Sequence, residues 1–312
     1  MVMKAGSPPL IGAIGALCLL ALLATGCSAA SASAPPRSSD DSSRVIEGRL
    51  RSGGLVRSYR LFVPAHLKQP APVVVVLHGG LQTPGGVADM TGFDREAERQ
   101  GFLAVYPAGV GRTFDAGVCC GPAKRLGVDD VGFVRDLLGH LATRYDMDPS
   151  RVYATGISNG GLLAYRLACE LPDVFAAVAP VAATLVGQCD PSSPVSILHI
   201  HGLRDRNIPF GGGFGPSGLQ KVDWPPVLAG VDRWRRIDRC ERNPVVDRDG
   251  PVMHRTWTGC GSAAGVELYT LADGGHSWPG GKPVPQSFGP TSRSLDATGV
   301  IWRFFQTHPK RT

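Results

Sequence analysis

The segment from Arg151 to Cys169 constrains the fold most, because a buried strand, a tight turn and a helix follow each other directly in it. The turn is Gly156-Ile-Ser-Asn-Gly160, so a glycine stands two residues before and two residues after Ser158. Glycines let the backbone reverse sharply without side-chain collisions. A serine on such a strand-to-helix turn is strained and exposed at the end of a sheet. Ser158 is therefore a candidate nucleophile, although a glycine-rich turn without chemistry has the same pattern.

Several apolar runs lack polar alternation, which is typical of strands buried on both faces of a parallel sheet. The expected buried strands are 72–77, 102–107, 151–156, 175–181 and 196–202; helical segments are expected at 87–100, 129–145, 159–169, 227–240 and 295–308, and further strands at 253–258 and 266–271. Two alternating stretches, 45–50 and 56–63, predict an antiparallel hairpin at a sheet edge. This order indicates an α/β fold with a doubly wound, mostly parallel sheet.

Residues 1–26 read as a lipoprotein signal peptide. Lys4 precedes an apolar run of about 15 residues, shorter than the roughly 20 that a membrane-spanning helix needs. The run ends in Leu-Ala-Thr-Gly-Cys27, which resembles a lipobox, so Cys27 is the expected lipidation site and a membrane surface of the cell envelope the expected partner. A plain signal peptide that releases a secreted protein is the alternative. Residues 27–44, rich in Ser, Ala and Pro, predict a flexible tether before one domain at 45–312.

The formal net charge of +6 does not indicate a nucleic-acid partner, because the basic residues form no continuous stripe. Their densest group, 233–239, alternates with apolar residues at helical spacing and fits the solvated face of a packed helix. His199 and His201 share one face of an expected strand, but two ligands do not make a zinc site. We expect no metal, no cofactor and a monomer.

Six cysteines follow the tether, an even number that indicates disulfides formed in an oxidising compartment. Cys240 and Cys260 lie between the same two expected elements, and we predict that they form a pair. The other four are Cys119, Cys120, Cys169 and Cys189. They allow three pairings, and because a ring closed between adjacent cysteines is strained, we expect the first two to bond to different partners.

A serine hydroxyl needs a base to accept its proton and an acid to orient that base. His276 lies in a tight glycine-rich loop directly after the last expected strand, where Trp278 could pack against its ring. Asp205 follows the strand 196–202 and therefore lies at the same sheet edge as Ser158. The order Ser, Asp, His is that of the α/β-hydrolases. A surface-loop histidine and a carboxylate that caps a turn are the alternatives.

The oxyanion that forms on a substrate carbonyl needs preorganised N–H donors. The backbone N–H of Asn159, directly after Ser158, is the first expected donor. The second should come from the loop after the first buried strand, where His78-Gly-Gly80 lets the backbone approach a substrate closely. Gly80, or alternatively Leu81, is the predicted donor, and His78 fits a structural hydrogen bond better than a base.

With these residues placed, the chain resembles the secreted esterases grouped with polyhydroxybutyrate depolymerases and with feruloyl and acetylxylan esterases, and it looks closest to their LpqC-type lipoprotein branch. The matching stretches are Leu77-His-Gly-Gly, Asp115-Ala-Gly-Val-Cys-Cys-Gly, Val128-Asp-Asp-Val-Gly-Phe, Asp148-Pro-Ser-Arg-Val-Tyr-Ala-Thr-Gly-Ile-Ser-Asn-Gly-Gly, His201-Gly-Leu-Arg-Asp and Gly274-Gly-His-Ser-Trp-Pro-Gly. The resemblance implies an α/β-hydrolase domain at 45–312, a triad of Ser158, Asp205 and His276, and backbone donors at Asn159 and the position after His-Gly.

Three hypotheses about function follow. The first is serine-dependent hydrolysis of carboxylic esters that are short-chain, aryl, or linked to a polyester or polysaccharide, because no long insertion that could form a lid is visible. The second is an envelope acyltransferase that uses the same triad. The third is a non-catalytic envelope-binding lipoprotein, and the chemically competent residues at 158, 205 and 276 count against it.

Overall fold

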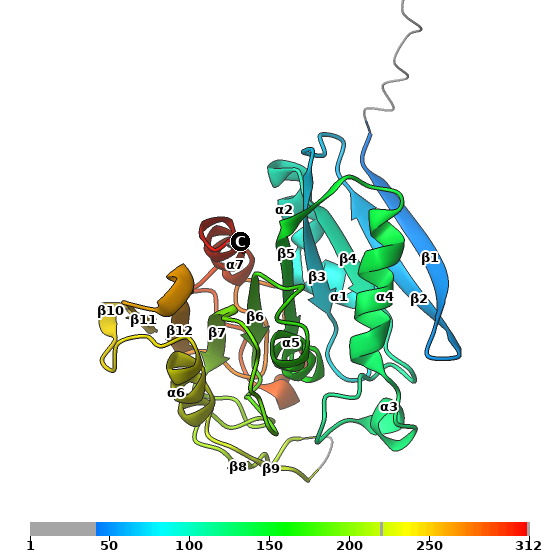
Figure 1. Cartoon of the computed structure of the whole chain (residues 1–312). Helices are drawn as coiled ribbons and strands as arrows, with labels where there is room; N and C mark the ends of the chain where they lie inside the picture. The colour runs from blue at the N-terminus through cyan, green and yellow to red at the C-terminus, as the bar shows by residue number, and fades with distance from the viewer. Residues whose placement is uncertain (1–41, 219–220, 311–312) are drawn as a thin grey trace, which may run out of the picture. The chain divides into compact units, whose positions relative to one another are not determined.

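The computed structural model describes residues 42–218 and 221–310, so the expected signal peptide, Cys27 and most of the tether lie outside the described residues. Within those ranges one sheet has the strand order β1-β2-β4-β3-β5-β6-β7-β12-β11-β10 (Figure 1). The strands are β1 Arg44–Ser52, β2 Leu55–Val63, β3 Ala71–Leu77, β4 Leu103–Pro107, β5 Met147–Ile157, β6 Ala177–Val181, β7 Ser196–Gly202, β10 Val245–Asp249, β11 Val252–Trp257 and β12 Val266–Leu271. Arg44, the last residue of the expected tether, is the first residue of β1.

The centre of the sheet is parallel and its two edges are antiparallel. The chain pairs in parallel from β4 through β3, β5, β6 and β7 to β12. The expected hairpin of β1 and β2 forms one edge. At the other edge β11 runs antiparallel to both β12 and β10. Strand β10 was not expected, because all five of its residues are exposed and therefore show no buried-face pattern.

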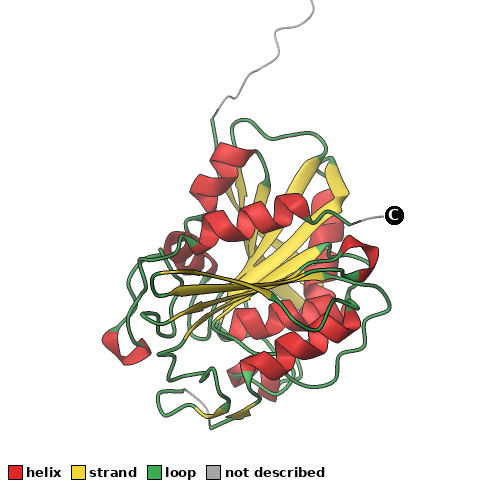
Figure 2. Cartoon of the chain, turned by 90° about the vertical axis from the view of Figure 1, so that its left-hand side faces the viewer, coloured by secondary structure: helices red, strands yellow, loops and turns green. Residues whose placement is uncertain are grey.

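Helices cover both faces of the sheet (Figures 1 and 2). The helices are α1 Pro84–Thr91, α2 Phe93–Gln100, α3 Gly121–Arg125, α4 Asp130–Ala142, α5 Asn159–Glu170, α6 Val227–Ile237 and α7 Ala297–Thr307. Helices α4, α5 and α6 pack on one face, and α1, α2 and α7 pack on the other. Every residue of β3 is buried; Val73 and Val75 belong to one core and Val74 and Val76 to the other. This is the doubly wound arrangement that the apolar runs predict.

The segment 87–100, expected as one helix, forms two. Helix α1 ends at Thr91, and Gly92 adopts a left-handed conformation with a φ of 72° before α2 begins. Glycine adopts such a conformation without steric cost, whereas a residue with a Cβ is strained in it. Side chains at the starts of α1, α4 and α7 accept backbone N–H groups, as N-caps do.

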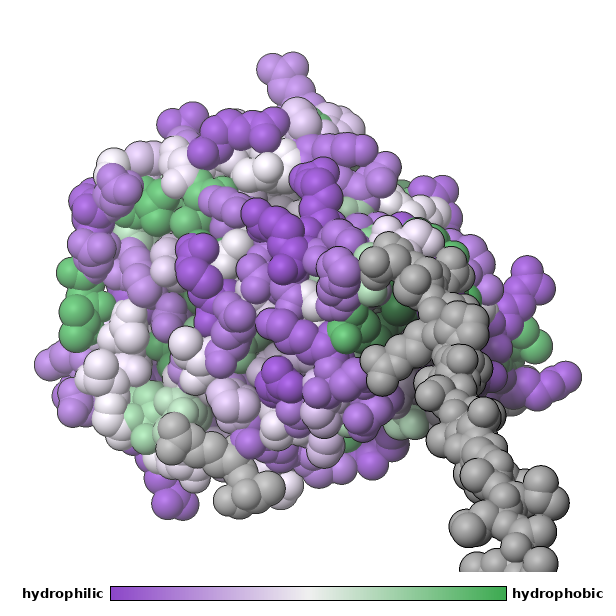
Figure 3. Space-filling view, turned by 90° about the horizontal axis from the view of Figure 1, so that it is seen from above, coloured by the Kyte–Doolittle hydropathy of each residue, from purple (hydrophilic) through white to green (hydrophobic). Residues whose placement is uncertain are grey.

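The two ends of the sheet differ. The lower side of Figure 1 carries α3 and a two-stranded ribbon of β8 Gly213–Phe214 and β9 Asp223–Trp224. Figure 3 views the molecule from the opposite, upper side, where hydrophilic side chains predominate and hydrophobic ones form small separate groups.

None of the helices within 42–218 and 221–310 combines the length and the apolar character that crossing a bilayer requires.

Candidate active site

Ser158 lies on the turn between β5 and α5 with a φ of 57° and a ψ of −121°. Few residues with a Cβ adopt a positive φ, so the turn stores strain. The neighbouring glycines allow it: a Cβ on Gly156 would lie 2.7 Å from backbone atoms of Gly160, and a Cβ on Gly160 would collide with the carbonyl oxygen of Leu77. The sequence pattern Gly-x-Ser-x-Gly therefore reflects backbone contacts between β3, β5 and α5.

Asp205 and His276 meet at the same edge of the sheet. The Nδ1 atom of His276 donates to Oδ2 of Asp205 at 2.7 Å, and both side chains are buried. The other carboxylate oxygen, Oδ1, accepts the backbone N–H groups of Asn207 at 2.8 Å and Ile208 at 2.9 Å. Burial acts to raise the pKa of Asp205, but the charge and hydrogen bond of His276 and the backbone donors outweigh burial and lower this pKa.

The expected contact between Trp278 and the ring of His276 is wrong. The indole of Trp278 is buried against Phe93, and its N–H donates to Thr298 at 3.0 Å. The ring that lies along His276 is instead that of Phe288, with centroids 6.0 Å apart and planes 21° from parallel. Phe288 follows in the same long loop, and no motif in the sequence signals this contact.

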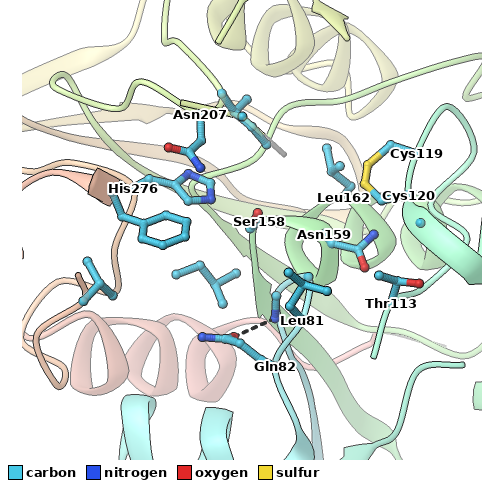
Figure 4. Close-up of a pocket in the computed structure, with 18 of the residues that line it drawn as sticks. Leu81, Gln82, Thr113, Cys119, Cys120, Ser158, Asn159, Leu162, Asn207 and His276 are labelled. Atoms are coloured by element: carbon cyan, nitrogen blue, oxygen red, sulfur yellow. Dashed lines mark hydrogen bonds between the residues drawn. A yellow bond between two sulfur atoms is a disulfide. The ribbon is translucent and has the colours of Figure 1, made fainter. Parts of the chain in front are cut away.

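A cavity of about 550 Å³ opens beside these residues. Ser158, Asn159, Gly80 and His276 line it, and Figure 4 shows Ser158 between the imidazole of His276 and the side chain of Asn159. In the described part of the chain, Oγ of Ser158 makes no hydrogen bond, and catalytic hydrogen bonds are often long before a substrate binds. Other lining residues are mostly apolar, namely Leu81, Met90, Ile157, Leu162, Ile208, Trp224, Val284 and Phe288. The lining residues that are described include no Asp, Glu, Lys or Arg, so the cavity suits an uncharged group.

The loop after β3 carries the two alternative oxyanion donors, Gly80 and Leu81. The N–H of Gly79 donates to Oε1 of Gln82 at 2.9 Å, and the N–H of Leu81 donates to the carbonyl oxygen of Arg112 at 2.8 Å. Between them, the N–H of Gly80 makes no hydrogen bond within the described residues. Of the two sequence alternatives for an oxyanion donor, Leu81 is therefore engaged elsewhere and Gly80 is available.

His78 has the structural role expected of it. Its Nε2 accepts the backbone N–H of Gly109 at 3.0 Å, and Nδ1 donates to the carbonyl oxygen of Gly79 at 2.8 Å. Burial lowers the pKa of His78 to about 4, which keeps the ring neutral at neutral pH. The imidazole thus ties the loop after β3 to the loop after β4.

The side chain of Asn159 makes contacts that the sequence did not signal. Its amide forms two hydrogen bonds with the backbone of Phe114, one to the N–H at 2.7 Å and one to the carbonyl oxygen at 2.9 Å. The long loop 108–127 is thereby attached directly to the residue after Ser158. Its residues Thr113, Cys119 and Cys120 line the cavity, so this loop is part of the candidate site.

The cysteines pair in three disulfides within the described residues. Cys240 is bonded to Cys260 as expected, and Cys169 to Cys189. Cys119 is bonded to Cys120, so the expectation that these two have different partners is wrong. The reason is tertiary: the end of α5 and the loop after β6 bring the Cα atoms of Cys169 and Cys189 to 5.2 Å, which leaves the adjacent pair with each other.

The fold is that of the α/β-hydrolases. An acetyl xylan esterase from Aspergillus awamori has a similar structure, with a TM-score of 0.59 at 14% sequence identity over 85% of this chain and 99% of that one. The family description "Esterase PHB depolymerase" matches residues 57–209.

Sequence relatives point to the same family. NocK of Nocardia uniformis subsp. tsuyamanensis, an esterase by inferred assignment, is 31% identical over 80% of this chain and 79% of its own length. Feruloyl esterase B of Piromyces equi is 30% identical over 55% of this chain, which spans only 32% of that protein. Poly(3-hydroxyalkanoate) depolymerase C of Paucimonas lemoignei is 24% identical over 70% of this chain and 57% of its own length. The chain belongs to the esterase family of the polyhydroxybutyrate depolymerases.

Proposed function

We propose that this protein is a serine-dependent carboxylic ester hydrolase. The observation that carries the proposal is the 2.7 Å hydrogen bond from His276 to Asp205 on the wall of a cavity that Ser158 also lines. Family membership supports ester hydrolysis, since the relatives are named as esterases and a depolymerase. Those names do not support the acyltransferase or the binding-protein hypothesis.

In the proposed reaction, Oγ of Ser158 attacks the ester carbonyl while Nε2 of His276 accepts the hydroxyl proton. Asp205 keeps the proton of His276 on Nδ1 and stabilises the imidazolium that forms. The imidazolium then protonates the leaving alcohol, and an acyl group remains on Ser158. Water attacks this acyl enzyme while His276 accepts a proton from it. The bond between the acyl carbon and Oγ of Ser158 then breaks, His276 returns the proton to Oγ, and the carboxylic acid leaves.

The negative oxygen of each tetrahedral intermediate needs N–H donors aimed at it. We assign this role to the backbone of Gly80 and Asn159. The free N–H of Gly80 and the start of α5 at Asn159 support the assignment, because the first N–H groups of a helix have no partner within the helix.

The test is the Ser158→Ala variant. We expect it to lower the rate of hydrolysis of p-nitrophenyl acetate by at least about 10³-fold, because the nucleophile is lost, while the circular dichroism spectrum stays unchanged. Ser58→Ala, on an exposed position of β2, is the matched control and should keep its full rate. A Ser158→Ala enzyme with near-normal turnover would refute the proposal.

The apolar, uncharged cavity favours short-chain or aryl acyl groups, and a polymer that carries such esters would reach it from the open side. A panel of esters that varies the acyl and the alcohol part separately would identify the preferred class. Export, and lipid attachment at Cys27 on a membrane surface, remain predictions from the sequence. Mass spectrometry of the processed N-terminus would test them.

A further inference from the structure

Three buried polar side chains form a continuous string behind Asp205. They are Tyr165 on α5 and His199 and His201 on β7, and at most 1% of each is exposed. The hydroxyl of Tyr165 lies 2.8 Å from Nδ1 of His199, and Nε2 of His199 lies 3.1 Å from Nδ1 of His201. Finally, Nε2 of His201 lies 2.9 Å from the carbonyl oxygen of Ile208. Neither histidine lines the cavity, so the string does not touch a substrate.

The carbonyl at one end determines the direction of every hydrogen bond in this string. A carbonyl oxygen can only accept, so Nε2 of His201 carries a proton and donates it to Ile208. In a neutral imidazole the other nitrogen, Nδ1, must then accept, and it accepts from Nε2–H of His199. Nδ1 of His199 must in turn accept, and the hydroxyl of Tyr165 is its donor. One tautomer of each ring satisfies all three contacts.

Both rings stay uncharged in this arrangement. Burial is the main cause that lowers the pKa of His201, and burial together with the neighbouring His201 lowers that of His199 well below its ordinary value. Asp205 and the backbone groups of Ile208 and Ala183 act to raise the pKa of His201, but burial outweighs these effects. The string therefore supplies fixed N–H dipoles and no net charge.

The end of the string acts on the turn that holds Asp205. The N–H of Ile208 donates to Oδ1 of Asp205, and the carbonyl oxygen of the same residue accepts from His201. Both backbone groups of Ile208, its N–H and its carbonyl oxygen, are thus held by hydrogen bonds. Nε2 of His201 also lies 3.5 Å from Oδ2 of Asp205, the oxygen that accepts from His276. A loss of the His201 donor would free the turn at the point where the carboxylate meets His276.

We propose that His201 is a positioning residue for the proposed triad, that its Nε2–H sets the orientation of the Asp205 turn, and that Tyr165 and His199 hold His201 in the required tautomer. The alternative tautomer would direct a lone pair of Nε2 at the carbonyl oxygen of Ile208 and at the carboxylate of Asp205. In that state the hydroxyl of Tyr165 would accept from Nδ1–H of His199, and its own buried O–H would lose the acceptor that Nδ1 now provides. This inference rests on the proposed function, because it assumes that Asp205 orients His276.

The experiment compares two substitutions of His201. His201→Phe keeps a ring but removes the donor, and we expect kcat to fall by about 10- to 100-fold with KM changed less than about 3-fold, since misplacement by a fraction of an ångström is costly. His201→Gln places an amide N–H near the former Nε2 and should restore kcat to within about 5-fold of the unchanged enzyme. A His201→Phe enzyme within 2-fold of normal kcat, or a Gln variant as impaired as the Phe variant, would overturn the proposal.

Proton NMR gives a readout that a purely structural role would not move. The Nδ1–H of His276, bonded to Asp205, should give a far-downfield resonance that weakens in His201→Phe and persists in His201→Gln. Should the Phe variant fail to fold, Tyr165→Phe carries the test, because it removes a single oxygen. We expect a 2- to 5-fold lower kcat and a shifted resonance, and no change in either would contradict the proposal.

The Ser158→Ala variant separates this inference from the proposed function. If that variant is inactive and His201→Phe is fully active, only the role of the string is refuted. If Ser158→Ala itself retains activity, the proposed function fails first.

Discussion

Two buried aspartates in this protein lie in contrasting surroundings. Asp205, in the turn after β7, has both oxygens hydrogen-bonded, to two backbone N–H groups and to His276. Asp238, at the C-terminal end of α6, is fully buried, and neither of its oxygens has a hydrogen-bond partner within the described residues. The indole N–H of Trp234 donates to the carbonyl oxygen of Val195. The N–H groups of Trp234 and Val195 act to lower the pKa of Asp238, but burial outweighs them.

The contrast shows that a buried carboxylate keeps its charge where an opposite charge and hydrogen-bond donors outweigh the effect of burial. The pKa of Asp205 is lowered although the side chain is buried, whereas burial raises the pKa of Asp238 to about 8. The C-terminal end of a helix is also the negative end of its dipole, which disfavours an anion at Asp238. The region after β7 is thus organised to hold a charge, and the region after α6 holds a neutral acid.

The largest expected effect is that of Asp205→Asn. An amide cannot accept the Nδ1 proton and stabilise an imidazolium as a carboxylate does, so kcat/KM should fall by on the order of 10³- to 10⁴-fold. Steady-state hydrolysis of p-nitrophenyl acetate would measure this loss, with the circular dichroism spectrum as the control for folding. If the variant loses less than 10-fold, the charge at Asp205 has no role in catalysis and the comparison with Asp238 loses its functional meaning.

Asp238→Asn should stabilise the protein at neutral and alkaline pH. The side chain of Asp238 keeps its proton up to about pH 8 in the folded protein, whereas the unfolded chain releases it near the ordinary pKa of an aspartate, 3.8. The free energy of unfolding therefore falls as the pH rises from about 4 to 8 and is level above that range. The Asp238→Asn variant has no carboxyl proton to release, so its free energy of unfolding does not fall in this way. The difference in its favour over the unchanged protein should grow over the same pH interval to about 4 kcal/mol or less.

Urea denaturation at pH 5 and at pH 8.5 would test the prediction for Asp238. The gap between the variant and the unchanged protein must be wider at the higher pH. An equal gap at both values would mean that Asp238 is ionised in the folded protein, and the contrast with Asp205 would disappear. Activity should stay within about 2-fold, since Asp238 does not line the site cavity.

Asp232 lies on α6, the helix that ends just before Asp238, and its substitution should have the smallest effect of the three. It is half exposed and paired with Arg235 at 2.9 Å and with Arg236. The hydrogen bond from Arg235 is the main cause that lowers its pKa. Asp232→Asn should destabilise the protein by about 0.2–1 kcal/mol, as exposed ion pairs do, and less so at high salt. A loss above 2 kcal/mol, or a loss that salt does not reduce, would show that the exposure of Asp232 does not distinguish it from the buried Asp205 and Asp238.

Much of the fold was predictable because it depends on local patterns. The runs of β3 and β7 are apolar without interruption, and both strands are buried as expected. The turn at Ser158 was predictable for a similar reason, since its flanking glycines are required by close backbone contacts at the turn itself. Strand β10 was not predictable in this way, because its residues are all exposed and only pairing with β11 makes it a strand.

The candidate site was predictable in its residues more than in its contacts. The positions of Ser158, Asp205 and His276 after their strands predict one sheet edge, and the structure brings the last two into contact. The stacking partner of His276, the anchoring of loop 108–127 and the pairing of adjacent cysteines carry no local signal. Each depends on segments that are far apart in the chain, where periodicity and turn chemistry give no information.

The amino-acid sequence alone predicts buried strands, a strained serine turn and a cross-linked, exported domain. It can do so because the hydrophobic period and the placement of glycines act between residues that are near each other in the chain. Tertiary structure decided which atoms meet: the hydrogen bond between His276 and Asp205 joins residues 71 positions apart. It also decided that burial is outweighed at Asp205 and not at Asp238. Such differences arise from how distant segments pack, and packing depends on the whole folded chain rather than on any one stretch of it.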